Sequence, residues 1–252
     1  MCTLTIDRRA GRLLLTMNRD ERWTRAPERP PALHPATGGG RAWVAPADGE
    51  RGGTWIGAND DGVVACLLNA YAPGDLDLIG RPDVPSRGEI IPGLLARGRD
   101  GVERFLDAEL DPTRYPSFTL VVATPEGARA LRWTLDRGLS HETIGEGWSL
   151  VSSSWWRAAE VTAWRRRRFD AWLAEGAPFV GTLPAFNLLE DPEAREQSPM
   201  MTRSFSGTRS VTRVEVDRER SLVGMRYWPR PGDGAIDPER PTAELELARR
   251  SE

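Results

Sequence analysis

The sequence predicts an α+β fold in which antiparallel sheets are covered by helices on their outer faces. Short segments rich in apolar and β-branched residues follow one another across tight turns, which is typical of hairpins. The helical patterns fall in two separate groups between runs of strands, an order that favours α+β over α/β architecture. No glycine-rich phosphate loop follows a predicted strand, so the sequence does not support a nucleotide-binding fold.

The N-terminal segment forms the clearest predicted hairpin. Residues 2–6 are rich in β-branched side chains, residues 7–11 have the composition of a turn, and residues 12–17 return as an apolar strand. A hairpin places its first and last residues opposite one another. We therefore expect Cys2 to lie close to Asn18-Arg19-Asp20.

The other elements follow from the same two periodicities. Alternation and turn signals predict further strands at residues 42–45, 52–57, 63–69, 118–123, 130–135, 148–153, 212–216 and 222–227. Helical spacing of apolar residues predicts helices at residues 87–97, 101–110 and 158–174. In the last helix we interpret the basic run Arg165–Arg168 as a solvated face. The segment 22–40, rich in Pro and Arg, is predicted as a surface loop.

Length and composition limit the possible functions. The 252 residues suffice for one large domain, which we place at residues 1–228, followed by a ragged tail at residues 229–252. Apolar residues make up 39% and charged residues 28%, as in a soluble globular protein. A net charge of -3 argues against nucleic-acid binding, and no apolar run is long enough to span a membrane.

The scarce reactive residue types narrow the chemistry further. All 34 basic residues are Arg, so there is no lysine for Schiff-base or P-loop chemistry. The two cysteines, Cys2 and Cys66, do not suggest a disulfide scaffold, and neither of the two histidines stands in a metal-ligand spacing. No signal-peptide pattern precedes the first strand, so we expect a cytoplasmic protein. From the histidine spacing and the lack of a phosphate loop, we also expect no metal and no cofactor.

Cys2 is the first candidate for chemistry. Because cysteine is small, removal of the initiator Met1 would leave Cys2 with a thiol and a free α-amine on one residue, which are a nucleophile and its potential base. An α-amine titrates at roughly 7.7–8.0 and can accept the thiol proton, directly or through one water. The alternative is that Cys2 is simply a small apolar residue at the start of a strand.

Asn18-Arg19-Asp20-Glu21 is the second candidate, and we expect it to end the second strand. A carboxylate within reach of the new ammonium would hold it in place, and Asp20 is our choice. Arg19 would lower the thiol pKa or bind a substrate carboxylate. Glu21 points to the opposite side of the strand and is interpreted as structural. The alternative for the whole cluster is a strand terminus with solvated charges.

Three further sites each have two possible interpretations. Asn69 closes an apolar run and is either a donor to an oxyanion or a cap for a loop, with equal weight. For Ser152-Ser153-Ser154 we favour hydrogen bonding at a strand end over a serine nucleophile, since no activating His is recognisable. Arg209 either reaches a central site or caps a turn. Cys66 lies within an apolar run and is expected in the core.

Together, these motifs resemble a known family. Met1-Cys2, Asn18-Arg19-Asp20-Glu21, Gly52-Gly53-Thr54-Trp55-Ile56-Gly57 and Leu68-Asn69 look like the NRDE family, also called transport and Golgi organisation protein 2, and later segments at residues 87–89 and 207–210 fit it as well. The family is similar in pattern to N-terminal-nucleophile (Ntn) hydrolases of the choloylglycine hydrolase and penicillin V acylase type. The resemblance implies a four-layer αββα fold with two stacked antiparallel sheets.

The resemblance also implies roles for individual residues. Cys2 would be the nucleophile, Asp20 would contact its α-amine, Asn69 would be an oxyanion donor, and Arg209 would match a late active-site arginine. We place Asn18, Ser153 and Trp55 in the substrate-binding set. The chain departs from the pattern at two positions, because Arg19 follows Asn18 where the bile-acid enzymes have arginine first, and Ser153 stands where a second oxyanion asparagine is expected.

These observations predict an Ntn hydrolase that cleaves a non-peptide amide of a small acyl compound through a thioester on Cys2. The alternative is a non-catalytic carrier for haem or another hydrophobic small molecule. It is motivated by the ten Trp residues and by the serine in place of the oxyanion asparagine.

Overall fold

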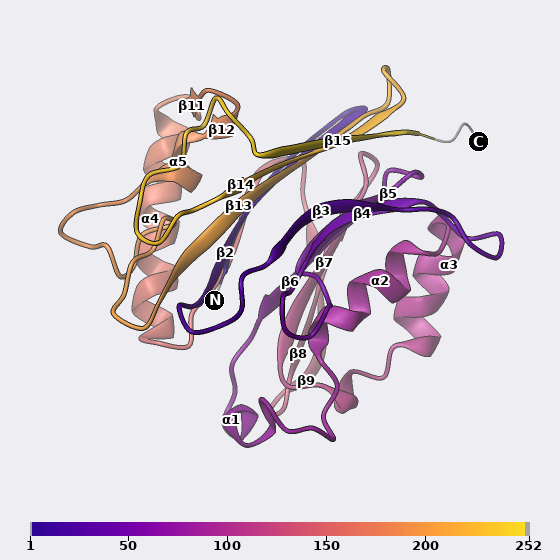
Figure 1. Ribbon diagram of the computed structural model, residues 1–252, viewed down its shortest axis with the longest axis horizontal. Helices are drawn as coiled ribbons and strands as arrows, with labels where there is room; N and C mark the ends of the chain where they lie inside the picture. Colours follow the sequence, from indigo (N-terminus) through magenta and orange to yellow (C-terminus); the bar gives the residue numbers. More distant parts are fainter. Residues whose placement is uncertain (1, 250–252) are drawn as a thin grey trace.

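Two antiparallel sheets form the centre of the computed structural model, which describes residues 2–249 (Figure 1). Sheet A has the strand order β10-β1-β2-β13-β14-β15, and sheet B has the order β3-β4-β5-β6-β7-β8-β9. The strands of sheet A are Cys2–Arg9 (β1), Arg12–Arg22 (β2), Gly147–Ser153 (β10), Ser206–Asp217 (β13), Leu222–Pro229 (β14) and Ala243–Ala248 (β15). Those of sheet B are Arg29–His34 (β3), Trp43–Ala47 (β4), Ile56–Asn59 (β5), Val64–Asn69 (β6), Phe118–Ala123 (β7), Ala128–Thr134 (β8) and Gly138–Ile144 (β9).

Helices cover the outer face of each sheet (Figure 1). On sheet A, α4 (Ala158–Ala174) and α5 (Ala185–Leu188) pack through Phe169, Trp172 and Phe186 against Leu150 of β10. On sheet B, α2 (Ile90–Leu95) and α3 (Arg99–Arg104) pack against the outward side chains of β6 to β8. The short elements are α1 (Asp75–Leu78), the helical turns Arg87–Glu89, Phe105–Glu109 and Pro112–Arg114, and the hairpin of β11 (Phe179–Val180) and β12 (Leu183–Pro184). No helix within residues 2–249 is long and apolar enough to cross a bilayer.

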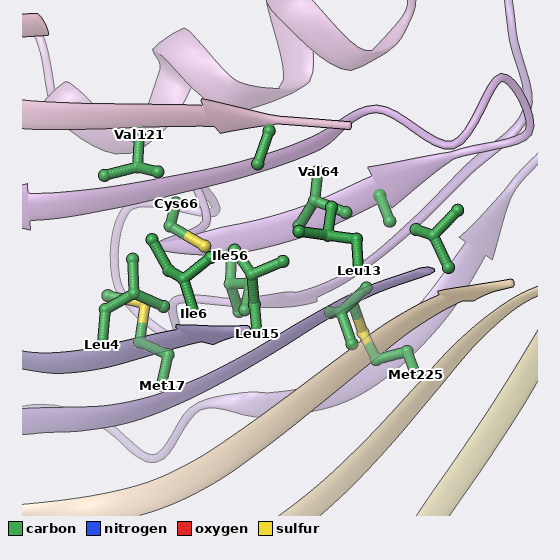
Figure 2. Packing of buried hydrophobic residues seen from close by; sticks show 14 of the residues in the cluster. Leu4, Ile6, Leu13, Leu15, Met17, Ile56, Val64, Cys66, Val121 and Met225 are labelled. Atoms are coloured by element: carbon green, nitrogen blue, oxygen red, sulfur yellow. The ribbon is translucent and has the colours of Figure 1, made fainter. Parts of the chain in front are cut away.

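The largest core cluster lies between the two sheets. Alternate residues of β1 and β2 turn their apolar side chains toward sheet B, because successive side chains of a strand point to opposite faces. Figure 2 shows Leu4, Ile6, Leu13, Leu15 and Met17 meeting Ile56, Val64, Cys66 and Val121 across this interface. The α+β class and the four-layer sandwich expected from the sequence are thereby confirmed.

Three strands of the two large sheets were not predicted from the sequence, and all three lie at sheet edges. β3 and β9 are the two edges of sheet B, and β15 is one edge of sheet A. β3 occupies the segment predicted as a loop, and β15 pairs with β14 within the segment predicted as a ragged tail, so residues 243–248 belong to sheet A. An edge strand buries little of its surface, as the mostly exposed residues of β9 show, and its hydrophobic pattern is correspondingly weak.

β2 is also longer than predicted. It continues to Arg22, so Asn18-Arg19-Asp20-Glu21 lies inside a strand and does not terminate it. The reason is pairing on both sides: β1 pairs with β2 as far as Arg19, and β13 continues the pairing to Arg22. Each residue of the motif therefore has a defined face of sheet A.

Candidate active site

Cys2 begins β1 in the interior of sheet A and is in register with one residue on each side. Its partners are Ser153 of β10 and Arg19 of β2, which confirms that the hairpin brings Cys2 to the Asn18–Glu21 motif. Directly opposed residues of antiparallel strands carry their side chains on the same face. Cys2, Arg19 and Ser153 therefore form one row, on the face from which Leu4 packs toward sheet B. We call these three residues the Cys2 row.

The Cys2 thiol is nearly closed off from solvent. Cys2 is 6% exposed, and burial raises the pKa of its thiol above the ordinary value. The negative charge of Asp20 acts in the same direction, whereas a hydrogen bond from the Asp20 backbone and the charge of Arg19 favour the thiolate. Cys66 is completely buried between the sheets, as expected for a core residue, and burial raises its thiol pKa further. Cys2 is thus the more accessible of the two thiols.

Arg19 is held by several partners at once. Its guanidinium lies 2.8 Å from Asp48, 3.3 Å from Glu28 and 3.5 Å from Glu21, and it stacks over the Trp55 ring at 4.5 Å from the ring centroid. Arg19 is 5% exposed. Because carboxylates of the protein already occupy this guanidinium, it is a fixed cation beside the thiol and not a free binder of a substrate carboxylate.

Two buried polar groups near the Cys2 row lack a hydrogen-bond partner among the described residues. One is the hydroxyl of Ser153 and the other is the indole N–H of Trp55. Buried polar groups are almost always paired with protein or with water, so these two donors are open to a ligand or to a water molecule. Both residues belong to the predicted substrate-binding set, and both have donors available to a ligand.

Asp20 lies on the other face of sheet A, toward α4. It follows Arg19 in the strand, so its side chain points away from the Cys2 row. Its Oδ1 accepts a hydrogen bond of 2.7 Å from the Thr208 hydroxyl, and its Oδ2 lies 3.5 Å from the Arg165 guanidinium. Burial raises the pKa of Asp20, while the charge of Arg165 opposes the increase. The Asp20 carboxylate therefore faces Arg165 and Thr208 on the opposite side of the strand, while the backbone of Asp20 hydrogen-bonds to the Cys2 thiol.

Asn18 has a structural role. It is fully buried, its amide nitrogen donates to the carbonyls of Asn187 and Pro199 at 2.8 and 3.1 Å, and its Oδ1 accepts 2.8 Å from the Asn187 amide. These bonds tie β2 to α5 and to the loop that follows. The assignment of Asn18 to substrate binding is therefore corrected, because its polar atoms are used by the fold and none of its surface is exposed.

Asn69 and Arg209 are less directly connected to Cys2. Asn69 ends β6, is half-buried, and its amide nitrogen lies 3.4 Å from the Tyr71 hydroxyl. Its oxyanion role remains a prediction. Arg209 falls at a register shift in β13, and a bulge of this kind re-aims a side chain. Its guanidinium donates to the carbonyl of Arg22 at 3.2 Å and lies 3.8 Å from Glu28, the carboxylate that also binds Arg19.

The position of Arg165 differs from the one predicted from the sequence. We expected it on a solvated face, but it is completely buried, whereas the next three arginines of α4 are exposed. Its spacing was the available signal, because Val161, Arg165, Phe169 and Trp172 recur on one helical face and three of the four are apolar. A charged residue on such a face must find partners inside the protein.

Two hollows of the surface lie away from Cys2. One, of about 300 Å³, is lined by Arg41, Asp61 and Arg99, and the other, of about 90 Å³, runs along β14 and β15. Neither hollow is lined by a residue of the Cys2 row. No cluster of His, Cys, Asp or Glu suited to a metal ion occurs within residues 2–249.

Comparison with known proteins adds a family and a fold. A family model described as Transport and Golgi organisation 2 matches residues 1–222. No curated protein is significantly similar to the chain in sequence. Among solved structures, an arginine-to-leucine variant of conjugated bile acid hydrolase from Clostridium perfringens is similar with a TM-score of 0.50 at 10% identity, over 98% of this chain and 92% of that chain.

Two further structures resemble the chain less closely. Penicillin V acylase from Agrobacterium tumefaciens has a TM-score of 0.44 at 12% identity, over 90% of this chain and 82% of that chain. The Caenorhabditis elegans ortholog of N-acylethanolamine-hydrolyzing acid amidase has a TM-score of 0.49 at 9% identity, over 84% and 92% of the two chains. At 10% identity the likeness to the bile acid hydrolase concerns the fold alone.

Proposed function

This chain belongs to the Transport and Golgi organisation 2 family, and we propose that it is an Ntn hydrolase that cleaves a non-peptide amide bond of a small acyl compound. The observation that carries the proposal is the Cys2 row, in which the thiol lies between Arg19 and Ser153. The bile acid hydrolase that shares the fold is named for hydrolysis of conjugated bile acids, which supports the general kind of reaction.

The proposed reaction begins with removal of Met1, which gives Cys2 a free α-amine. This amine takes the proton of the thiol, and the thiolate attacks the carbonyl carbon of the amide. The C–N bond then breaks as the ammonium returns its proton to the leaving amine, and a thioester on Cys2 remains. Water, deprotonated by the α-amine, attacks the thioester, releases the carboxylic acid and restores the thiol. No cofactor enters any step.

Donors near the thiol would stabilise the oxyanion. The unpaired hydroxyl of Ser153 and the unpaired indole N–H of Trp55 are buried donors in the vicinity of the Cys2 row. Asn69 is the third predicted donor, at the end of β6. Loss of one such donor in other enzymes costs about 2.7–4 kcal/mol of transition-state stabilisation. Substitution of Ser153 by Ala therefore tests the row directly.

The first experiment addresses the N-terminus and the thioester. Intact mass spectrometry is expected to show that Met1 is absent, and incubation with a panel of acyl amides and p-nitrophenyl esters should give a mass increase that maps to Cys2. Cys2→Ala should abolish the adduct. Cys66→Ala is the matched control, because Cys66 is fully buried, and it should leave the adduct unchanged.

Retention of Met1, or an adduct that survives in Cys2→Ala, would contradict the proposal. Because Cys2 is only 6% exposed, the rate of adduct formation also measures how readily a probe reaches the thiol in the folded protein. Slow labelling by every probe, together with fast labelling after mild denaturation, would mean that the native site does not admit substrates.

A second candidate function is a non-catalytic carrier for haem or another hydrophobic small molecule. The observation that favours it is an exposed aromatic pair: Trp155, just after β10, and Phe205, just before β13, are 47% and 45% exposed, with ring centroids 5.7 Å apart. Titration of haem into the wild type and Cys2→Ala separates the two functions. Saturable binding that is lost in Trp155→Ala and kept in Cys2→Ala, without any thioester in the wild type, would support the carrier.

A further inference from the structure

Arg165 of α4 gathers four acceptors in the interior, beside the start of β1. Its guanidinium donates to the carbonyls of Gln197 and Ser198 at 2.8 and 3.1 Å, and it lies 3.5 Å from both the carbonyl oxygen of Cys2 and Oδ2 of Asp20. The side chains of Arg165 and Asp20 have no exposed surface. One planar cation therefore contacts the backbone of the nucleophile and the carboxylate behind it.

Burying the Arg165 guanidinium costs folding free energy, which suggests that the residue has a role other than stability. A buried charge loses its hydration, and an apolar side chain of similar volume often serves the stability of a fold as well or better. Position 165 is on the apolar face of α4, between Val161 and Phe169, where such a side chain would fit the helical pattern. The five N–H groups of Arg suit a site with several acceptors in different directions, which a lysine ammonium cannot match.

The carboxylate is oriented from both sides. The Thr208 hydroxyl binds Oδ1 of Asp20 at 2.7 Å, and Arg165 faces Oδ2. The carbonyl oxygen of Cys2 that Arg165 contacts is three bonds from the α-nitrogen of the same residue. Holding this carbonyl and Asp20 with one guanidinium fixes where the α-amine of a processed Cys2 lies relative to the carboxylate.

We propose that Arg165 is a positioning residue of the Cys2 site, which holds the first residue of β1 and Asp20 in the geometry that the α-amine needs and places a positive charge behind the thiol. This inference rests on the proposed function, and it adds to it a residue from α4 that does not touch the substrate.

The charge of Arg165 acts on the thiol together with that of its neighbours. Among the described residues, those that interact electrostatically with Cys2 include Arg19 and Asp20 of β2, Arg165 of α4, Arg87 before α2, and Cys66 of β6. A nearby cation favours the thiolate, so loss of Arg165 should raise the pKa of Cys2 while the other groups stay in place.

The test compares Arg165→Met, Arg165→Lys and the control Arg167→Met, which makes the same change at an exposed position of the same helix. The readouts are the pH dependence of Cys2 alkylation by iodoacetamide, located by peptide mass spectrometry, and the rate of Cys2 acylation by p-nitrophenyl butyrate. We expect Arg165→Met to move the alkylation profile upward by about one pH unit. Arg165→Lys should keep the profile close to that of the wild type but acylate about tenfold more slowly, because one ammonium cannot reach all four acceptors.

Each outcome has a distinct meaning. A folded Arg165→Met with the wild-type alkylation profile would overturn the inference, since a merely structural arginine would not move a titration. If Arg165→Met does not fold, as circular dichroism would show, Arg165→Lys decides, and wild-type acylation in that variant would overturn the positioning role. If the wild type itself is never acylated, the proposed function fails, and the alkylation profiles still decide whether Arg165 acts on Cys2.

Discussion

Replacing Asp48 by Asn should release the clamp that fixes Arg19 beside the thiol. The Asp48 carboxylate binds Arg19 at 2.8 Å and Arg25 at 2.8 Å, and it accepts backbone hydrogen bonds from Glu50 and Arg51 at 3.1 and 2.9 Å. Burial raises the pKa of Asp48, but the hydrogen bonds from Arg25 and Arg51 and the two guanidinium charges outweigh it and lower the pKa to about 2. Asp48 follows β4 of sheet B and Arg19 lies in sheet A, so the clamp joins the two sheets.

The expected loss of stability follows from the linkage between protonation of Asp48 and folding. The difference between 3.8 and about 2 corresponds, at about 1.4 kcal/mol per pKa unit, to about 2.5 kcal/mol of folding free energy at neutral pH. Because the pKa is lowered in the folded state, this stability is present above about pH 4 and is lost as the pH falls toward 2. At pH 3 about half of it should remain.

The assay is urea unfolding of the wild type and Asp48→Asn at pH 7 and pH 3. We expect Asp48→Asn to lower the free energy of unfolding by about 2 kcal/mol at pH 7, and by about half as much at pH 3. Asp136→Asn is the control, because its ion pair with Arg137 is exposed and such pairs contribute about 0–1 kcal/mol. A loss at pH 7 no larger than that of the control, or an equal loss at both pH values, would refute the reasoning.

Two other substitutions test packing around the site. In Gly53→Ala, the new Cβ would lie 2.6 Å from the carbonyl carbon of Gly88, and overpacking of this kind costs about 1–3 kcal/mol; Gly145→Ala, with no atom within 4 Å of the new Cβ, should be neutral, and equal unfolding midpoints would contradict the argument. Asn18→Ala removes the bonds to Asn187 and Pro199 and should destabilise the fold by about 1–3 kcal/mol in the same assay. Wild-type stability of that variant would mean that water replaces the lost amide.

Some features of the candidate site could be predicted from the sequence and others could not. The short turn after β1 and the apolar strand behind it were enough to predict that Cys2 meets the Asn18–Glu21 motif, because hairpin pairing is local. The strand boundary was missed, since the pairing that extends β2 to Arg22 comes from β13, far along the chain. The contact between the segments 52–57 and 87–89 could not be predicted from the sequence either: the carbonyl of Gly88 accepts a hydrogen bond from the backbone N–H of Thr54 at 3.0 Å.

The interior strands, the outer helices and the choice of Cys2 as the candidate thiol could be predicted from the sequence, because they depend on periodicity and motifs over a few neighbouring residues. That Cys2 and Asp20 lie on opposite faces of sheet A, and that Arg165 faces the Asp20 carboxylate, became visible in the folded structure alone. Asp20 and Arg165 are 145 positions apart, and their contact depends on how α4 packs on the sheet. Local patterns do not encode such a contact, whereas burial of two opposite charges in one layer enforces it.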